Sequence, residues 1–440
     1  MERFIVRDLS TAADERYQQA VLACAAHRAD AGTLIQAALA ADPDCVLAQC
    51  LSGFGALLLM RAERIDGARK ALMAAQRVFE RRSLDPKECL HLAALDHAVA
   101  GRLNQAADTM GRAVALDPLD LAAIKLEHAL RFMLGDATGM RRSLERAVTT
   151  WRPYMPGYGY VQGCLAFALE ETGALDTALA CGRTACESAP DDAWGAHAIA
   201  HCYEMMGRPK QGLAWLWACE PALKDINNFR HHLDWHQALF CLELERVGDA
   251  LALYDRRLAV TRRDDFRDFA NAASLLTRIE VEGVAVGDRW RALGDLARER
   301  IEEANLAFAS LHDLLGLLGA RYDSDSARLL ATLRRSAQAR DGTQACVLAE
   351  LGLTLAEMLR ARRDGAHERA AILFLVAEPT LARIGGSNSQ RALFWRLGIH
   401  SALAAGRRDI ARGLLARRNR YYRRSRWAGA LESELAPTAA

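Results

Sequence analysis

Two pairs of histidines with the same spacing are the candidates for chemistry in this sequence. The segment HAIAH carries His197 and His201, and the segment HLDWH carries His232 and His236. Histidines four residues apart lie on one face of an α-helix, so each pair directs two imidazoles to the same side. Neutral imidazole binds transition metals, and near neutral pH it also transfers protons. These four residues are therefore candidate catalytic residues and candidate ligands for a divalent Zn, Fe, Mn or Cu ion.

The two pairs recur at one interval along the chain. His232 follows His197 by 35 residues, and His236 follows His201 by the same 35 residues. Glu204 continues the face of the first pair, three residues beyond His201, and is a fifth candidate catalytic residue. If 35 residues correspond to one structural repeat, the pairs lie at equivalent positions on neighbouring helices, whose axes pack about 8–10 Å apart. We therefore predict a shared polar pocket; the alternative is a hydrogen-bonded polar lining within a helical stack.

A glycine-punctuated repeat indicates the elements that would position these histidines. Gly101, Gly135, Gly173 and Gly207 each end a helical segment, and they are separated by 34, 38 and 34 residues. An Ala-rich second helix and a turn with proline follow each of the first three. This order is typical of tetratricopeptide repeats, in which glycine supplies the left-handed exit from the first helix. We predict an all-α, tetratricopeptide-like α-α superhelix whose first helices line the concave surface.

Composition supports helices throughout and suggests three regions. Apolar residues form 51% of the 440 residues, proline is scarce at 10, and no long run of alternating β-branched residues favours a sheet. Residues 1–87 read as degenerate helical hairpins, and residues 88–260 as clear repeats that carry the histidine-rich inner face. Residues 261–440 read as further hairpins that close the superhelix.

Charge and cysteine content bear on partners and location. A net charge of +2 gives no electrostatic argument for nucleic acid or membrane as a partner. No window approaches about 18 uninterrupted apolar residues, so we expect no membrane-spanning helix. The first residues, MERFIVRDL, carry charges where a signal peptide needs an apolar stretch, and the 11 cysteines form no CxxC pair. We predict a cytoplasmic protein, and homo-oligomerisation through the terminal helices is compatible with this prediction.

An ordered series of segments resembles the tetratricopeptide repeat protein 38 family. The run PGYGYVQGCLAFALEETGAL begins it at residue 156, and HAIAHCYEMMGR, HHLDWHQALF, FASLHDLL and GGSNSQRALF follow in order. The similarity extends over about residues 110–420. It implies a helical-repeat fold and a set of site positions, but no particular reaction. Besides the four histidines and Glu204, the resemblance marks these positions as ligand-binding: His128, Glu170, Trp235, His312, Gln390 and Arg391.

The last of these segments, GGSNSQR, suits a loop that leads into a helix N-terminus. Backbone amides there, together with Arg391, could hold an anion; an ordinary helix start with a buried arginine is the alternative. The sequence also departs from the family pattern. Asp234 stands where the family usually has an aromatic residue, and Ser310 and Ala392 stand where an aspartate is expected.

Two functions from different classes follow from these residues. The first is an interior pocket lined by His and Glu that binds a small polar or anionic ligand, through a metal ion or directly. Such a pocket would suit hydrolase- or lyase-type acid–base or metal-assisted chemistry. The second is a scaffold that holds a partner helix or peptide in the concave groove, with its histidines exposed. Whether the protein is an enzyme stays open at this point.

Overall fold

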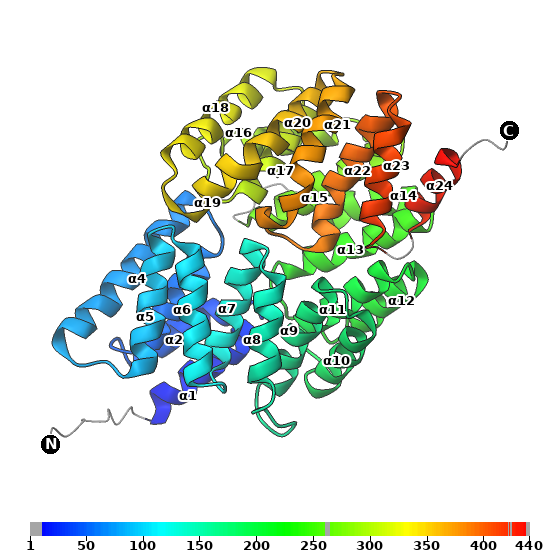
Figure 1. Cartoon of the computed structure of the whole chain (residues 1–440). Coiled ribbons are helices and arrows are strands. Elements are labelled where there is room, and N and C mark those ends of the chain that lie inside the picture. The colour runs from blue at the N-terminus through cyan, green and yellow to red at the C-terminus, as the bar shows by residue number, and fades with distance from the viewer. Residues whose placement is uncertain (1–10, 260–264, 421, 423–424, 437–440) are drawn as a thin grey trace.

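The computed structural model describes residues 11–259, 265–420, 422 and 425–436, which are helical nearly throughout (Figure 1). The predicted all-α fold is confirmed, because the described residues contain no strand and only an isolated bridge between Arg28 and Ile226. Residues 1–10, on which part of the cytoplasmic prediction rested, lie outside the described residues. In the described residues, no helix combines the length and the apolar character that crossing a membrane requires.

Most consecutive helices pair as hairpins. The first twelve helices are α1 (Thr11–Ala25), α2 (Ala31–Ala41), α3 (Val46–Leu57), α4 (Ala62–Arg81), α5 (Pro86–Val99), α6 (Leu103–Leu116), α7 (Leu121–Leu134), α8 (Ala137–Ala147), α9 (Tyr158–Glu171), α10 (Leu175–Ser188), α11 (Ala193–Met205) and α12 (Pro209–Cys219). Those that follow are α13 (Phe229–Glu243), α14 (Val247–Leu253), η1 (Tyr254–Leu258), α15 (Phe266–Val281), α16 (Arg289–Arg298), α17 (Ala307–Gly319), α18 (Asp323–Ala339), α19 (Gly342–Val347), η2 (Leu348–Gly352), α20 (Leu353–Arg363), α21 (His367–Ala377), η3 (Glu378–Ile384), α22 (Asn388–Ala404), α23 (Arg408–Arg418) and α24 (Arg426–Leu435). The π-helical segments η1 and η2 and the 3₁₀ segment η3 continue the helices that precede them. The division of the chain at residues 87 and 260 stays a prediction.

The glycines that mark the repeat have the predicted backbone conformation. Gly101, Gly135, Gly173 and Gly207 have φ values of 74°, 69°, 83° and 65°, in the left-handed region that glycine enters without steric cost. In the hairpin of α13 and α14, Glu245 takes this place with a φ of 61°. Each such residue ends a first helix and lets the chain turn back into its partner helix.

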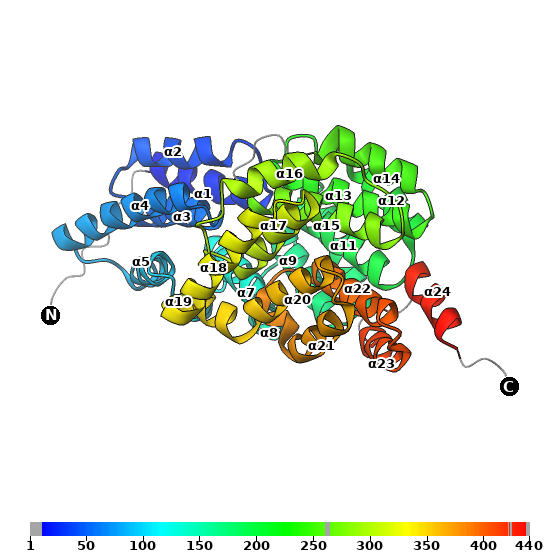
Figure 2. The same ribbon diagram turned by 90° about the horizontal axis from the view of Figure 1, so that it is seen from above.

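The hairpins stack into a superhelix that turns back on itself (Figures 1 and 2). The first helices α9, α11, α13, α15 and α17 contact one another in this order. The later hairpins meet the early ones: Thr343 at the start of α19 donates its backbone N–H to the carbonyl of Gly101 at 2.9 Å. The loop after α1 also meets the loop before α13, where Asn227 donates its backbone N–H to the carbonyl of His27 at 2.7 Å. The first helices are thereby enclosed.

The two helices that carry the histidine pairs lie in this enclosed interior. In α11, every residue except Glu204 is buried, and in α13 every residue from His232 to Leu242 is buried. A helix that is buried around its whole circumference lies inside a packed core. The side chain of Asp192 caps α11 by accepting the backbone N–H of Trp194 at 3.1 Å, which fixes where this helix begins.

Candidate metal centre

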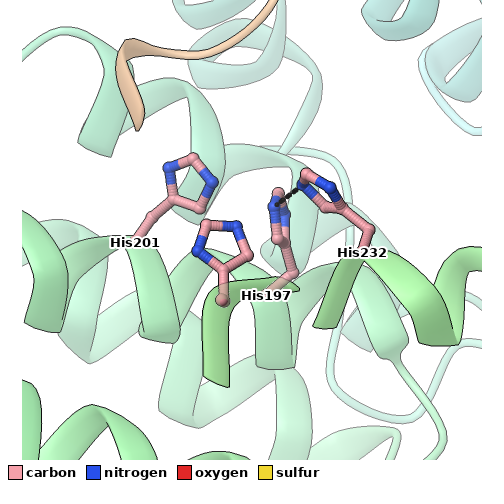
Figure 3. Close-up of side chains that lie close together, drawn as sticks. His197, His201 and His232 are labelled. Atoms are coloured by element: carbon pink, nitrogen blue, oxygen red, sulfur yellow. Dashed lines mark hydrogen bonds between the residues drawn. The ribbon is translucent and has the colours of Figure 1, made fainter. Parts of the chain in front are cut away.

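The four predicted histidines meet between α11 and α13. One ring nitrogen of each of the four lies within 4.8 Å of the corresponding nitrogen of every other. The Nε2 atoms of His197 and His232 are 3.0 Å apart, and Figure 3 shows these rings meeting, with His201 directed to the same space. All four side chains are at most 7% exposed. The 35-residue register therefore corresponds to spatial contact.

Two of the histidines are oriented by hydrogen bonds on the far side of their rings. His232 Nδ1 donates to Asn271 Oδ1 at 3.0 Å, and His236 Nδ1 donates to Glu204 Oε2 at 3.2 Å. A neutral imidazole carries one proton, so this assignment leaves Nε2 of each ring with its lone pair. Metal-binding histidines in proteins have the same arrangement, with the second nitrogen held by an amide or carboxylate oxygen.

His201 lies beside a buried pair of carboxylates at the end of α9. Its Nδ1 is 3.2 Å from Glu170 Oε2, which is an ion-pair distance without the angle of a hydrogen bond. Burial, and then the nearby charge of Glu204, raise the pKa of Glu170 to about 8. Glu171 binds Arg391 at 3.0 Å and, with Glu170 and His201, forms a second group of potential metal ligands.

The electrostatic environment keeps the four imidazoles neutral. Burial, and then the neighbouring imidazoles, hold the pKa of His197 and of His236 well below the usual value of 6.5. Burial also lowers the pKa of His232 and His201. Neutral imidazole is the form that binds a metal ion, so the cluster needs no deprotonation before it can act as a ligand set.

Among the described residues, His197 has neither a hydrogen bond at Nδ1, as His232 and His236 have, nor a carboxylate at ion-pair distance, as His201 has. It lies at the boundary between the histidine cluster and a cavity of about 100 Å³. The polar and aromatic lining of this cavity includes His27, His128, Trp194, His197, His232 and Gln390. A ligand in this cavity would therefore lie directly against the cluster.

Two other predicted site residues lie near the cluster without belonging to it. His128 lines the cavity, with its ring 5.4 Å from that of Trp194 between centroids. Burial, and then the charge of Lys125, lower the pKa of His128 to about 3. Trp235 is fully buried and stacks on His232 at a centroid distance of 5.2 Å. It packs against His232 and His236 and does not line the cavity.

The remaining predicted residues make local structural contacts, and Gln390 in addition lines the cavity. His312 Nδ1 donates to the carbonyl of Phe308 at 2.8 Å, and this histidine is not part of the four-histidine group. The side chain of Gln390 accepts the backbone N–H of Ser387 at 2.9 Å and completes the capping box of α22. Arg391 binds Glu171 at 3.0 Å, so the arrangement matches a helix start with a buried, paired arginine.

The three departures from the family pattern also have defined places. Asp234 faces away from the histidines and binds Arg257 at 2.8 Å. Ser310 donates to the carbonyl of Leu306 at 3.2 Å. Ala392 lines a second, larger cavity on the other side of Glu204.

Two residues of the centre were missed from the sequence. Asn271 on α15 lies 39 residues after His232. Extending the 35-residue spacing by one more repeat, with a tolerance of a few residues, could have predicted its position. His27 lies far away in the chain and reaches Trp194, with parallel rings 5.7 Å apart, only because the superhelix turns back on itself. No local pattern in the sequence signals this contact.

Together, the fold and the site define a tetratricopeptide-like α-α superhelix with an interior histidine cluster. No family model matches the chain. A solved structure of Naa15/Naa10 bound to HypK-THB is similar over 97% of this chain, with 14% sequence identity and a TM-score of 0.26. The match covers 66% of that chain, which is slightly less than two thirds of its length. Function is therefore argued from the site itself.

Proposed function

We propose that this protein binds one divalent transition-metal ion at the histidine cluster and uses it on a small polar or anionic ligand. His201, His232 and His236 are the principal ligands in this proposal, and His197 is the group that faces the ligand. The observation that carries it is the convergence of four neutral, buried imidazoles within 4.8 Å. Imidazole nitrogens suit Zn, Cu and Fe, and Zn²⁺ accepts four such ligands in a tetrahedral arrangement.

The charge balance around the cluster supports a cation. Glu170 and Glu204 lie against its outer side, and Glu171 is already neutralised by Arg391. Buried carboxylates without a counter-charge are costly, and the raised pKa of Glu170, to about 8, reflects this cost. A divalent ion among the histidines would favour the ionised form of Glu170 and would lie near the half-buried carboxylate of Glu204. It would also give the unpaired ring nitrogens of His201 and His236 a partner.

The asymmetry of the four histidines suggests how they divide their roles. His232, His236 and His201 have an oxygen atom close to their outer nitrogen, whereas His197 has none. A ligand group needs a fixed ring, and a proton-transfer group needs access to the substrate. His197 and His232 both border the cavity of about 100 Å³, and the Nδ1 of His197, which has no partner among the described residues, suits a proton acceptor in hydrolase- or lyase-type chemistry. The metal, when bound, would supply Lewis-acid activation.

The scaffold function remains the alternative for a tetratricopeptide-like fold, but the burial of the four histidines favours a metal centre. The scaffold hypothesis expected exposed histidines, whereas these four are at most 7% exposed. We also propose, from the ordered motifs alone, that the chain is related to the tetratricopeptide repeat protein 38 family. Its cytoplasmic location likewise remains a proposal.

Titration with Co²⁺ tests the proposed ligand set, because tetrahedral Co²⁺ absorbs strongly in the visible and reports its coordination directly. We expect one Co²⁺ per chain with intense visible bands, and displacement by Zn²⁺. The His232→Ala variant should lose these bands, and the His128→Ala variant, which removes a buried histidine outside the cluster, should keep them. Weak octahedral-type spectra, or identical spectra for the two variants, would remove the basis for a metal centre.

A further inference from the structure

A second cavity, of about 430 Å³, lies on the other side of Glu204 from the histidine cluster. It lies where α13, α15, α22, α23 and α24 come together and is partly open to solvent, and its volume lies within the range typical of small-molecule sites. Its lining includes four arginines and three glutamates, which are Arg278, Arg396, Arg418, Arg426, Glu204, Glu243 and Glu432. Leu239 and Leu242 of α13 form an apolar part of the wall.

Arg278 on α15 is a buried arginine without an ion pair. Its side chain is 2% exposed, and its terminal nitrogens donate to Ser274 Oγ at 2.5 Å and to the carbonyl of Ser389 at 2.6 Å. Both acceptors are neutral, and no carboxylate of the described residues lies within ion-pair distance. Burial, and then the charge of Arg396, lower the pKa of Arg278 to about 9. The side chain stays charged at neutral pH, so its burial has an electrostatic cost that the neutral acceptors offset only in part.

Arg418 at the end of α23 is also a buried arginine without an ion pair among the described residues. It is 2% exposed and lies between the rings of Tyr422 and Trp427, at 4.3 and 5.3 Å from their centroids. Its terminal nitrogens donate to two neutral oxygens, at 3.1 Å and 3.4 Å, and its Nε has no partner among the described residues. Burial lowers the pKa of Arg418 to about 10.

The other two arginines of the cavity show what an ordinary arrangement looks like. Arg396 binds Glu243 at 2.9 Å and Glu282 at 3.2 Å, and Arg426 binds Glu282 at 2.6 Å. Their charges are therefore neutralised by the protein. Arg278 and Arg418 differ from these two arginines, because neither binds a carboxylate of the described residues. A buried arginine is normally paired with an acid.

We infer that this cavity is a binding site for a small organic anion, whose carboxylate or phosphate group binds between Arg278 and Arg418. Guanidinium groups bind both kinds of oxyanion through paired N–H donors, and these interactions are strong where water is excluded. The apolar wall formed by Leu239 and Leu242 suits a short hydrocarbon part of the ligand. The inference concerns different residues from the proposed metal centre and does not depend on it.

The cavity is connected to the histidine cluster through one side chain. Glu204 lines the cavity and also accepts the hydrogen bond from His236 at 3.2 Å. Arg278 packs on Trp235, at 5.4 Å from the ring centroid, and Trp235 stacks on His232. An anion bound here therefore lies one side chain away from the cluster.

Isothermal titration of the full chain with inorganic phosphate and, separately, with succinate tests the inference. The protein is first stripped of metal and the chelator removed, so that the metal centre does not contribute, and NaCl keeps the ionic strength constant. We expect saturable binding of at least one of the two anions at one site per chain. Arg278→Gln and Arg418→Gln should each weaken this binding about 10-fold or more, since each removes charge-assisted hydrogen bonds.

Arg417→Gln is the matched control, because Arg417 is the neighbour of Arg418 on α23 and binds Glu378 at 3.2 Å. It should leave the affinity unchanged. If an Arg→Gln variant does not fold, Ala428→Glu keeps both arginines and introduces a competing carboxylate from the cavity wall, and it should also weaken binding. No saturable heat with either anion up to about 10 mM, or equal affinity in all variants, would overturn the inference.

Discussion

The Nε2 atoms of His197 and His232 lie 3.0 Å apart, on two helices whose histidines are separated by one repeat of the chain. His232 donates its Nδ1 proton to Asn271, so a neutral His232 presents a lone pair to His197. In the metal-free protein, His197 therefore donates its Nε2 proton to that lone pair. A metal ion that binds His232 Nε2 would replace this hydrogen bond and leave His197 available for proton transfer.

The first prediction concerns the unequal roles of the histidines. His201→Ala, His232→Ala and His236→Ala should each weaken Zn²⁺ binding by about 100-fold or more, because each removes an oriented ligand. His197→Ala should weaken it by only about 10-fold. Competition with a chromophoric chelator measures these affinities. An equal loss for all four variants would show that His197 is a ligand like the others.

The second prediction concerns the residues that orient the ligands. Asn271→Ala and Glu204→Gln should lower the Zn²⁺ affinity by about 10- to 100-fold, since each loosens the ring of one ligand. Glu243→Gln is the control: Glu243 lies at the end of α13, as Glu204 lies near the end of α11, but it binds Arg396 and not a histidine. The same chelator competition applies. If Glu243→Gln had as large an effect as Glu204→Gln, the specific role of Glu204 would be lost.

The third prediction uses the pKa of His128, which burial and Lys125 lower to about 3. In the unfolded chain this pKa is about 6.5, so the unfolded state takes up a proton as the pH falls below 6.5 and the folded state does not. The contribution of the neutral ring to stability is therefore present above pH 6.5 and is lost as the pH falls toward 3. Between pH 7 and 5, the metal-free wild type should lose about 2 kcal/mol more of its unfolding free energy than His128→Leu. Urea denaturation at both pH values measures the difference, and equal losses would contradict the assigned pKa.

Spacing alone was enough to predict how the histidine pairs meet. The 35-residue interval holds because α11 and α13 are equivalent helices in adjacent hairpins, and glycines such as Gly173 and Gly207 end the preceding helices in the left-handed conformation. The periodicity of the sequence therefore predicts the helical hairpins and the contacts between neighbouring repeats. The all-α superhelix follows from the same signal.

Contacts that depend on the long-range path of the superhelix could not be read from the sequence. His27 reaches Trp194 because the loop after α1 packs against the loop before α13. The arginine-rich cavity likewise requires α24 to pack back on the end of α13, where the backbone N–H of Arg426 donates to Glu243 at 2.7 Å. Each of these contacts joins segments more than 150 residues apart, over which small rotations between repeats accumulate.

The fourth prediction concerns how the superhelix closes. At Gly135, a Cβ atom would lie on the backbone carbonyl of Ala382 in η3, whereas at Gly173, which also has a positive φ, a Cβ atom meets nothing within 4 Å. Gly173→Ala should therefore cost only the left-handed strain of about 1–2 kcal/mol. Gly135→Ala should cost clearly more, because the contact between α7 and η3 must open. Thermal denaturation of both variants measures this, and equal costs would argue against close packing at this point.

Elemental analysis of the purified protein is the most direct test of the metal centre. The wild type, expressed in medium containing the usual trace metals and purified without chelator, is compared with the variant in which His197, His201, His232 and His236 are all alanine. Circular dichroism first establishes that both are folded. We expect about one transition-metal ion per chain in the wild type and none in the variant. Metal far below one equivalent in a folded wild type that also takes up none on addition of Zn²⁺, or the same content in both proteins, would contradict it.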